Sequence, residues 1–247
     1  MQDNDHQSLE AGSVAAIIPA AGSGRRFGSD RNKLFSTLAG RPLWYHSAAR
    51  LAASDQIQRI VMPIASGDRE TFAAEYQSLV DELGIELVDG GSERTESVRA
   101  GLQAIGEDAA INRIAVHDAA RPLVSSKDLE RVFAVAAQTG AAILATPVSG
   151  TLKRDLGDGA ACETVDRREL WIALTPQVFS VELLRRAYQR HRGRAATDDA
   201  QLVERMGHPV TLVRGSADNI KITHPEDLAI AAAILARQDS KTNDETT

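Results

Sequence analysis

Short runs of apolar, largely β-branched residues recur along the chain, and segments with the apolar spacing of amphipathic helices lie between them. Continuous apolar runs of this length are typical of strands that are buried on both faces of a parallel sheet. Because parallel strands need helical, right-handed crossovers, the pattern predicts an α/β, Rossmann-like domain with a mostly parallel sheet. The predicted strands are Val14–Pro19, Ile60–Ile64, Ile85–Val88, Ile114–Val116 and Ala141–Thr146.

Three segments have the i, i+3, i+4 apolar spacing that predicts a helix with one buried face. Two of them follow pairs with the spacing of a helix cap, Ser125 with Asp128 and Thr223 with Glu226. The three predicted faces are Val98, Leu102 and Ile105; Leu129, Val132, Phe133 and Ala136; and Leu228, Ala231, Ala232 and Leu235.

The 247 residues are enough for one α/β domain with a full core, which we assign to residues 13–237. Residues 1–12 are expected to be a disordered lead-in rather than a signal peptide, and residues 238–247 a flexible tail. The net charge of −6 argues against a nucleic-acid groove. A single cysteine, Cys162, excludes an internal disulfide, and no apolar run approaches a membrane span. These features predict a cytoplasmic protein that binds neither nucleic acid nor membrane.

One stretch breaks the alternation of strands and helices. Thr151–Leu156 and residues 160–166 have the pattern of two strands around a glycine turn, Gly157-Asp158-Gly159. The stretch has too few apolar residues for a core of its own, and an isolated hairpin is marginal in water. We therefore predict a protruding arm over about residues 150–167 that packs on a second subunit.

The first predicted strand runs directly into a glycine-rich loop, Pro19–Gly28. The loop lacks the Gly-Lys-Ser/Thr of a P-loop, and Phe27 stands where the dinucleotide fingerprint requires its third glycine. A plain turn is a fair alternative, but glycines at the end of a first strand let backbone N–H groups approach phosphates closely. The loop adds cations, Arg25 and Arg26, and Lys33 follows it. Transfer of a nucleotidyl group needs such cations and a metal ion more than it needs proton transfer.

A second polar cluster follows the strand Ile114–Val116. Asp118 is expected at the carboxyl edge of the sheet, where one carboxylate can hold a magnesium ion that bridges phosphates. The alternative is an aspartate that caps the next turn. The neighbouring His117 is given no role, because strand histidines are more often packed or hydrogen-bonded. Farther along, the alternation in Asn219–Thr223 predicts a strand with Lys221 on its polar face.

Six ordered motifs resemble those of the 2-C-methyl-D-erythritol 4-phosphate cytidylyltransferases of the non-mevalonate isoprenoid pathway. Each motif alone is a moderate signal, but the ordered set covers the chain from about Val14 to Leu235 and is highly specific. The motifs are P-A-A-G-S-G-R-R-F-G at Pro19–Gly28 with Lys33, G-G-S-E-R-T-E-S-V at Gly90–Val98, V-H-D-A-A-R-P at Val116–Pro122, T-V-D-R with L-W-I-A-L-T-P-Q within Thr164–Gln177, T-D-D-A from Thr197, and D-N-I-K-I-T-H-P-E-D at Asp218–Asp227.

The resemblance implies transfer of a cytidylyl group from CTP to methylerythritol phosphate, with Mg²⁺ held by Asp118. It implies that Arg26 and Lys33 stabilise the transition state and that Arg167 and Lys221 orient the acceptor phosphate. It also implies a homodimer that exchanges the arm. The residues implied to bind CTP are Ala20, Ala21, Gly22, Gly24, Arg25, Gly91 and Ser97, and those implied to bind the acceptor are Arg121, Thr197 and, from the partner subunit, Thr151.

Two alternatives to this function stay open at the level of sequence. A ribitol-5-phosphate cytidylyltransferase would share the fold and the residues around the triphosphate, and would differ only around the acceptor. A non-catalytic nucleotide-binding regulator could use the same scaffold, because one fold hosts many functions. The joint presence of Arg26, Lys33, Asp118 and Lys221 favours an enzyme over a binding module.

Overall fold

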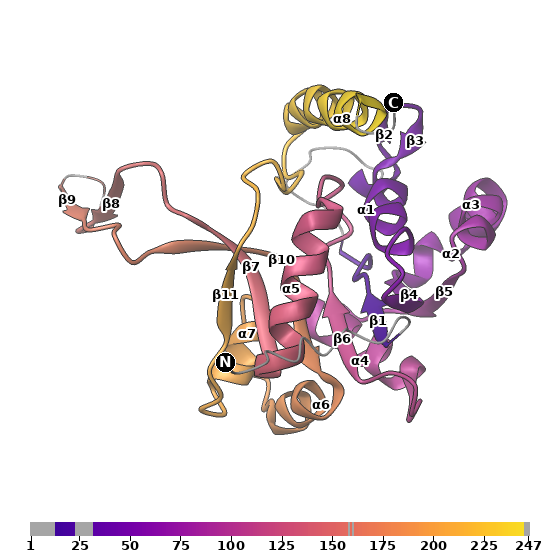
Figure 1. Ribbon diagram of the computed structural model, residues 1–247, viewed down its shortest axis with the longest axis horizontal. Helices are drawn as coiled ribbons and strands as arrows, with labels where there is room; N and C mark the ends of the chain where they lie inside the picture. The colour runs from indigo at the N-terminus through magenta and orange to yellow at the C-terminus, as the bar shows by residue number, and fades with distance from the viewer. Residues whose placement is uncertain (1–12, 23–31, 158, 160, 245–247) are drawn as a thin grey trace, which may run out of the picture.

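The computed structural model describes residues 13–22, 32–157, 159 and 161–244, and its centre is one seven-stranded sheet (Figure 1). The strand order is β11-β7-β10-β6-β1-β4-β5. Neighbouring strands are parallel except where β10 pairs with β6 and β7. The predicted α/β class, the mostly parallel sheet and all five predicted strands are confirmed. The strands are β1 (Val14–Ile17), β4 (Ile57–Ile64), β5 (Ile85–Asp89), β6 (Arg113–Val116), β7 (Ala141–Pro147), β10 (Trp171–Ser180) and β11 (Thr211–Arg214).

Both faces of the sheet are covered by helices, which is why its central strands are apolar on both sides. Along β1, Val14 and Ala16 belong to one core and Ala15 and Ile17 to the other. The first core packs against α1 (Leu43–Ala52), α5 (Ser126–Thr139) and α8 (Asp227–Asp244), and the second against α4 (Arg94–Ile105), α6 (Val181–Arg190) and α7 (Asp199–Glu204). The first two predicted helix faces lie in these cores; of the third, Ala231 and Leu235 are buried and Leu228 packs against the first core, but Ala232 is exposed. Within the described chain, no helix is long and apolar enough to cross a membrane.

Close contact between α4 and β1 depends on Gly101. A Cβ at this position would lie 2.7 Å from Cγ2 of Ile17, closer than packed carbon atoms approach one another. Glycine therefore lets α4 approach the sheet at the end of β1.

The remaining elements are short, and the C-terminal helix is longer than expected. Helix α8 continues to Asp244, so residues 238–244, which were assigned to a flexible tail, are helical. Ser125 caps α5 as predicted by accepting from the Asp128 N–H. Near the start of α8 it is Asp227, not Glu226, that accepts from the Thr223 N–H. The short elements are η2 (Lys33–Phe35), β2 (Thr37–Leu38), β3 (Arg41–Pro42), η3 (Ser66–Asp68), α2 (Arg69–Thr71), η4 (Phe72–Tyr76) and α3 (Gln77–Glu82).

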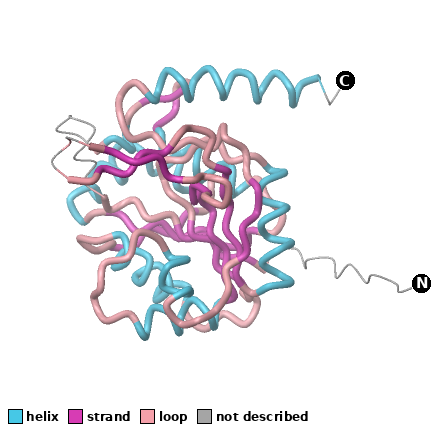
Figure 2. The backbone as a smooth tube through the Cα atoms, turned by 90° about the vertical axis from the view of Figure 1, so that its left-hand side faces the viewer, coloured by secondary structure: helices cyan, strands magenta, loops and turns pink. Residues whose placement is uncertain are grey.

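The predicted arm is present and extends far from the domain (Figure 1). Strands β8 (Leu152–Asp155) and β9 (Cys162–Val165) form an antiparallel hairpin. Figure 2 views the molecule from the side on which the arm projects in Figure 1, and the two strands of the hairpin lie in front of the body. The base of the arm exposes large apolar side chains, which are Leu170, Trp171 and Ile172.

The prediction of a strand over Asn219–Thr223 is wrong. The segment has no sheet partner because β11 already occupies the edge beside β7. Local bonds bend the chain instead, since the N–H groups of Asn219 and Ile220 donate to Ser216 and Asp218. The Ile222 N–H then donates to the carbonyl of Ala120, which brings this loop against the end of β6.

Candidate active site

A pocket of about 440 Å³ lies at the carboxyl ends of β1, β5 and β6. This edge is where open parallel sheets commonly bind ligands. Its walls come from four segments that are far apart in sequence. They are residues 19–22 after β1, Gly91–Ser97 at the start of α4, Asp118–Ala120 after β6, and the loop with Lys221 and Thr223, with Lys33 and Leu34 completing the wall.

Asp118 lies in this wall as the centre of a group of cations. Its Oδ2 accepts from Lys221 Nζ at 2.8 Å and lies 3.6 Å from Arg121 Nε. Its Oδ1 lies 3.4 Å from Arg94 Nε. Burial raises the pKa of Asp118, but Lys221 and Arg94 outweigh burial and hold the pKa well below its usual range. The carboxylate is therefore charged and already oriented before any ligand binds.

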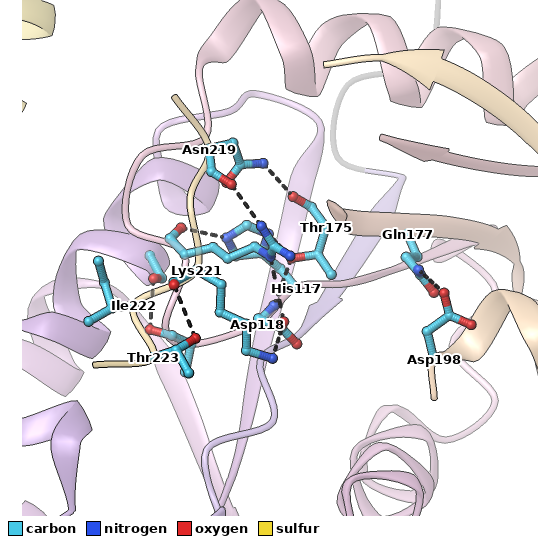
Figure 3. A network of polar contacts seen from close by, with 12 residues as sticks. His117, Asp118, Thr175, Gln177, Asp198, Asn219, Lys221, Ile222 and Thr223 are labelled. Atoms are coloured by element: carbon cyan, nitrogen blue, oxygen red, sulfur yellow. Dashed lines mark hydrogen bonds and ion pairs between the residues drawn. The ribbon is translucent and has the colours of Figure 1, made fainter. Parts of the chain in front are cut away.

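A buried polar network fixes the loop that carries Lys221 (Figure 3). The Asn219 side chain donates to the Thr175 carbonyl at 2.8 Å, and Arg121 donates to the Asn219 carbonyl at 2.7 Å. Thr175 Oγ1 accepts from the Asp118 N–H at 3.0 Å and lies 3.1 Å from His117 Nδ1. These contacts join the loop to β10 through Asn219 and Thr175, and join β10 to the end of β6 through Thr175 and Asp118.

His117 belongs to this network rather than to the pocket wall. Its ring is fully buried, and Nε2 lies 3.0 Å from the Arg121 carbonyl. Burial lowers the pKa of His117 to about 4, so the imidazole is neutral at physiological pH. It is packed and hydrogen-bonded, as expected for a strand histidine without a role in the chemistry.

The opposite end of the pocket is built from small residues. The Gly91 N–H donates to Ser97 Oγ at 3.2 Å, which ties the residues before α4 to its first turn. At the adjacent Gly90, a Cβ would lie 2.6 Å from the Cβ of Ala21 and 2.9 Å from Ser97 Oγ. Glycine is therefore required for the two segments to approach each other. This end combines Ala20, Ala21, Gly22, Gly91 and Ser97, all of which were predicted to bind CTP.

Lys33 also lines the pocket. Its Nζ donates to the Ile222 carbonyl at 2.7 Å. The bond connects the turn after the glycine-rich loop to the loop that carries Lys221. Two lysines that were predicted to act on the same reaction, Lys33 and Lys221, therefore line one cavity.

Several predicted site residues are not in this cavity. Arg167 and Thr151 lie exposed on the arm, where Arg167 donates to the Ser149 carbonyl. Thr197 is also exposed and lines a separate hollow beside Trp171 and Gln201. One folded chain thus brings together the nucleotide side of the predicted site and leaves these acceptor-side residues apart. Gly24, Arg25 and Arg26 lie outside the described residues.

Arg94 is a pocket residue that the sequence analysis did not select. It begins α4, and besides its contact with Asp118 it donates to Oδ2 of the buried Asp199 at 2.6 Å. The arginine stands inside the motif Gly90–Val98, where only the glycines and serines were considered. The available signal was that Arg94 stands between Gly91 and Ser97, two residues that were predicted to bind CTP.

The mostly parallel sheet is covered on both faces, and the cations Lys33, Arg94 and Lys221 line a pocket at its carboxyl edge. These features are typical of α/β proteins of the nucleotide-binding class. The family model for 2-C-methyl-D-erythritol 4-phosphate cytidylyltransferase (IspD) matches residues 14–237. The chain belongs to this family, and the resemblance stated from the motifs is confirmed.

Named relatives agree with the family match. The 2-C-methyl-D-erythritol 4-phosphate cytidylyltransferase of Rhodopirellula baltica is 55% identical over 234 residues, which cover 91% of this chain and 96% of the relative. The enzyme of the same name from Pelotomaculum thermopropionicum is 43% identical over 232 residues, covering 91% and 95%. A crystal structure of the Thermus thermophilus enzyme superposes with a TM-score of 0.74 at 36% identity, covering 91% of this chain and 99% of that one.

Proposed function

We propose that this protein transfers the cytidylyl group of CTP to 2-C-methyl-D-erythritol 4-phosphate. An oxygen of the acceptor phosphate forms a bond to the α-phosphorus, and the bond from that phosphorus to the bridging oxygen breaks. The electron pair of the broken bond leaves with pyrophosphate. The observation that carries the proposal is the family match over residues 14–237, joined to a pocket in which Lys33, Lys221 and Asp118 converge.

Negative charge grows on the α-phosphate and on pyrophosphate during this step, so fixed cations favour the transition state. Lys33 donates to the Ile222 carbonyl and Lys221 donates to Asp118, so contacts within the chain hold both side chains. Because both ammonium groups are already positioned, little reorganisation is needed when charge develops. We assign Lys33 to the transition state and Lys221 to the acceptor phosphate, and Arg26 stays a predicted partner of Lys33.

The small-residue end of the pocket supports recognition of cytosine. We propose that backbone groups of Ala20, Ala21 and Gly91 offer fixed donors and acceptors to the base, at an end of the pocket that small residues line. A base that cannot match these fixed donors and acceptors leaves them unpaired, which is costly inside a pocket. Gly22 and Ser97 complete this end.

Asp118 has the chemistry to hold a divalent cation together with the triphosphate. Within the described residues, no group of three or more His, Cys, Asp or Glu side chains could hold a metal alone. Mg²⁺ commonly keeps water ligands and is bound through one or two carboxylates plus substrate phosphates, and an ionised Asp118 fits that requirement. When bound, the ion would offset charge on the phosphate oxygens. Asp118 also holds Lys221 in place, with Nζ 2.8 Å from Oδ2.

The exposed acceptor-side residues support a homodimer. Thr151 and Arg167 lie on the arm, away from their own chain's pocket, and the arm exposes Trp171 and Ile172 at its base. We infer that the arm packs on a second subunit and that Thr151 of the partner subunit reaches the acceptor. Arg121 stays a predicted acceptor-binding residue; its guanidinium is buried behind Asp118, with Nε 3.6 Å from Oδ2 of that carboxylate. The exposed free thiol of Cys162 fits a reducing cytoplasm.

The direct test supplies CTP and Mg²⁺ with methylerythritol phosphate or ribitol 5-phosphate and measures pyrophosphate release. We expect faster turnover with methylerythritol phosphate, and a loss of about 10²-fold or more in Lys33→Ala. Lys127→Ala removes an exposed lysine on α5, outside the pocket, and serves as the matched control. Faster turnover with ribitol phosphate would overturn the acceptor, and CTP binding without turnover on either acceptor would favour a regulator.

A further inference from the structure

The contacts of Arg94 continue beyond the pocket into the core. Its guanidinium lies between two carboxylates, 3.4 Å from Asp118 through Nε and 2.6 Å from Asp199 through Nη1. Asp199 also accepts from the hydroxyl of Tyr188 on α6. Both Asp199 and Tyr188 are buried, whereas 27% of the Arg94 side chain is exposed at the pocket wall. The buried Asp199 thus anchors the Arg94 guanidinium through Nη1, while part of the side chain remains exposed to the pocket.

The anchor is itself firmly held. Gln177 on β10 accepts from the N–H groups of Asp199 and Ala200 at 3.1 and 3.0 Å, and it donates to Asp198 at 2.8 Å. Figure 3 shows this Gln177–Asp198 contact beside the end of the sheet. The start of α7 is therefore fixed to the strand that also supplies Thr175 to the network of Asp118. An anchor tied to the sheet fixes the direction of the Arg94 guanidinium.

An arginine with a purely structural role would not need to line the pocket, whereas Arg94 does line it. Its two contacts use Nε and Nη1, so within the described part of the chain Nη2 has no hydrogen-bond partner. Arg94 is also the first residue of α4, a helix end where the backbone adds positive potential toward the same cavity. A planar guanidinium with two edges fixed and one nitrogen available suits a phosphate oxygen.

We propose that Arg94 is a further phosphate-binding residue of the pocket and that Asp199 and Tyr188 are its positioning residues. The inference rests on the proposed function, since it takes CTP as the ligand. Burial alone would lower the pKa of Arg94, but Asp199 and Asp118 raise it above its ordinary value, so the cation is permanent. Arg94 touches the nucleotide phosphates, whereas Asp199 and Tyr188 act through Arg94.

The test compares the binding of CTP and of cytidine to the full-length protein by isothermal titration calorimetry. Replacing Arg94 alone leaves Asp199 as a buried, unpaired charge and risks misfolding. The double variant Arg94→Met with Asp199→Asn removes both charges together. We expect its Kd for CTP to rise about tenfold or more, with the Kd for cytidine changed less than twofold. Arg94→Lys should also weaken CTP binding more than cytidine binding, but to a smaller extent. Lysine keeps the positive charge, although its ammonium cannot replace the planar guanidinium.

Tyr188→Phe tests the positioning role. It removes one hydroxyl, and we expect the Kd for CTP to rise about threefold while cytidine binding stays unchanged. A purely structural Tyr188 would weaken both ligands together, which would overturn its positioning role. Arg69→Met is the charge-matched control, since Arg69 forms an exposed pair with Asp89 and should leave CTP binding unchanged.

Two results would overturn the assignment of Arg94 while leaving the proposed function intact. One is unchanged CTP affinity in the folded double variant, and the other is an equal loss of CTP and cytidine affinity. A wild-type protein that binds no CTP would overturn the proposed function and the assignment of Arg94 with it. Because the readout is binding, a wild type that binds CTP without transferring it would reject the proposed reaction alone.

Discussion

The pocket and the arm contain site residues in opposite states. In the pocket, Asp118, Lys221 and Arg94 are held by hydrogen bonds and ion pairs from three or more segments of the same chain. On the arm, Arg167 and Thr151 are exposed, and the apolar base beside them is uncovered. The difference agrees with the proposed homodimer, in which one chain would hold the nucleotide side and the arm of the partner subunit would complete the acceptor side.

The comparison also separates stability from activity. Charges in the pocket pair with buried groups, so changing them should reduce both the unfolding free energy and the rate. Side chains of the arm lie in solvent in a single chain, so changing them should reduce the use of the acceptor and leave the stability of the subunit intact.

The largest expected effect is that of Asp118→Asn. Removing this carboxylate leaves Lys221 and Arg121 without their anion, while Arg94 keeps Asp199. The unfolding free energy should fall by about 3 kcal/mol, because breaking a buried ion pair strands its partner. Pyrophosphate release should fall by about 10³-fold. Chemical denaturation and a steady-state assay measure the two quantities, and a variant with normal stability and normal rate would contradict the role of Asp118 as the centre of the network.

A smaller loss is expected for Lys221→Met, which removes a half-exposed cation but leaves Asp118 paired with Arg94 and Arg121. The rate should fall by about 10²-fold, since one fixed charge beside the transferring phosphate is lost. The unfolding free energy should fall by less than about 1 kcal/mol, because the pair is partly solvated. Lys127→Ala is again the control. A stability loss as large as that of Asp118→Asn would mean that Lys221 supports the fold more than the chemistry.

Arg167→Ala isolates the arm. The KM for the acceptor should rise about tenfold, whereas the Kd for CTP and the melting temperature should stay at wild-type values. The neighbouring Arg168→Ala is a matched control, because Arg168 pairs with the exposed Asp166. If CTP binding weakened as well, the arm would contribute to the nucleotide side, and the proposed division between pocket and arm would be wrong.

The smallest expected effect concerns Asp227, below the loop of Lys221. Hydrogen bonds from the N–H groups of His224 and Thr223 lower the pKa of Asp227 below its ordinary value of 3.8. The unfolded state therefore binds the proton more readily, and the stabilisation is complete above about pH 4 and is lost as the pH falls through the folded-state pKa. Asp227→Ala should cost about 1 kcal/mol at neutral pH and less in acid, measured by urea denaturation. Asp239→Ala, on the exposed side of α8, is the control and should change the unfolding free energy at neutral pH by less than about 0.5 kcal/mol.

The parallel strands were predictable because their apolar runs reflect burial on two sides, as in β1. Strand β10 was not, because it carries Pro176 and the buried polar residues Thr175 and Gln177. Thr175 accepts from the Asp118 N–H and Gln177 accepts from the Asp199 N–H. Because these two buried residues are polar, β10 lacks the continuous apolar run that would predict a strand. The loop with Lys221 was misjudged for the opposite reason, since Asn219 is buried by hydrogen bonds although the alternation assigned it to the polar face.

Within the site, motifs located the residues that line the pocket but not those that act through a neighbour. Gly91, Ser97, Asp118 and Lys221 belong to motifs whose residue types fit nucleotide chemistry directly. Asp199 gave no such signal, because its partner Arg94 is 105 positions away and the pairing exists only in three dimensions. Contacts of this kind arise because α4 and α7 lie on the same face of the sheet, which local patterns do not encode.

The bond from Lys33 to the Ile222 carbonyl spans 189 residues of sequence and has a consequence for synthesis. At about 5–20 residues per second, a ribosome needs roughly 10–40 seconds to make the chain between these two positions. The strands β1, β4 and β5 exist well before the loop that completes the pocket. A nascent chain therefore passes through a stage in which half the sheet is present but CTP has no complete site, and nucleotide can stabilise the protein only after translation has passed residue 222.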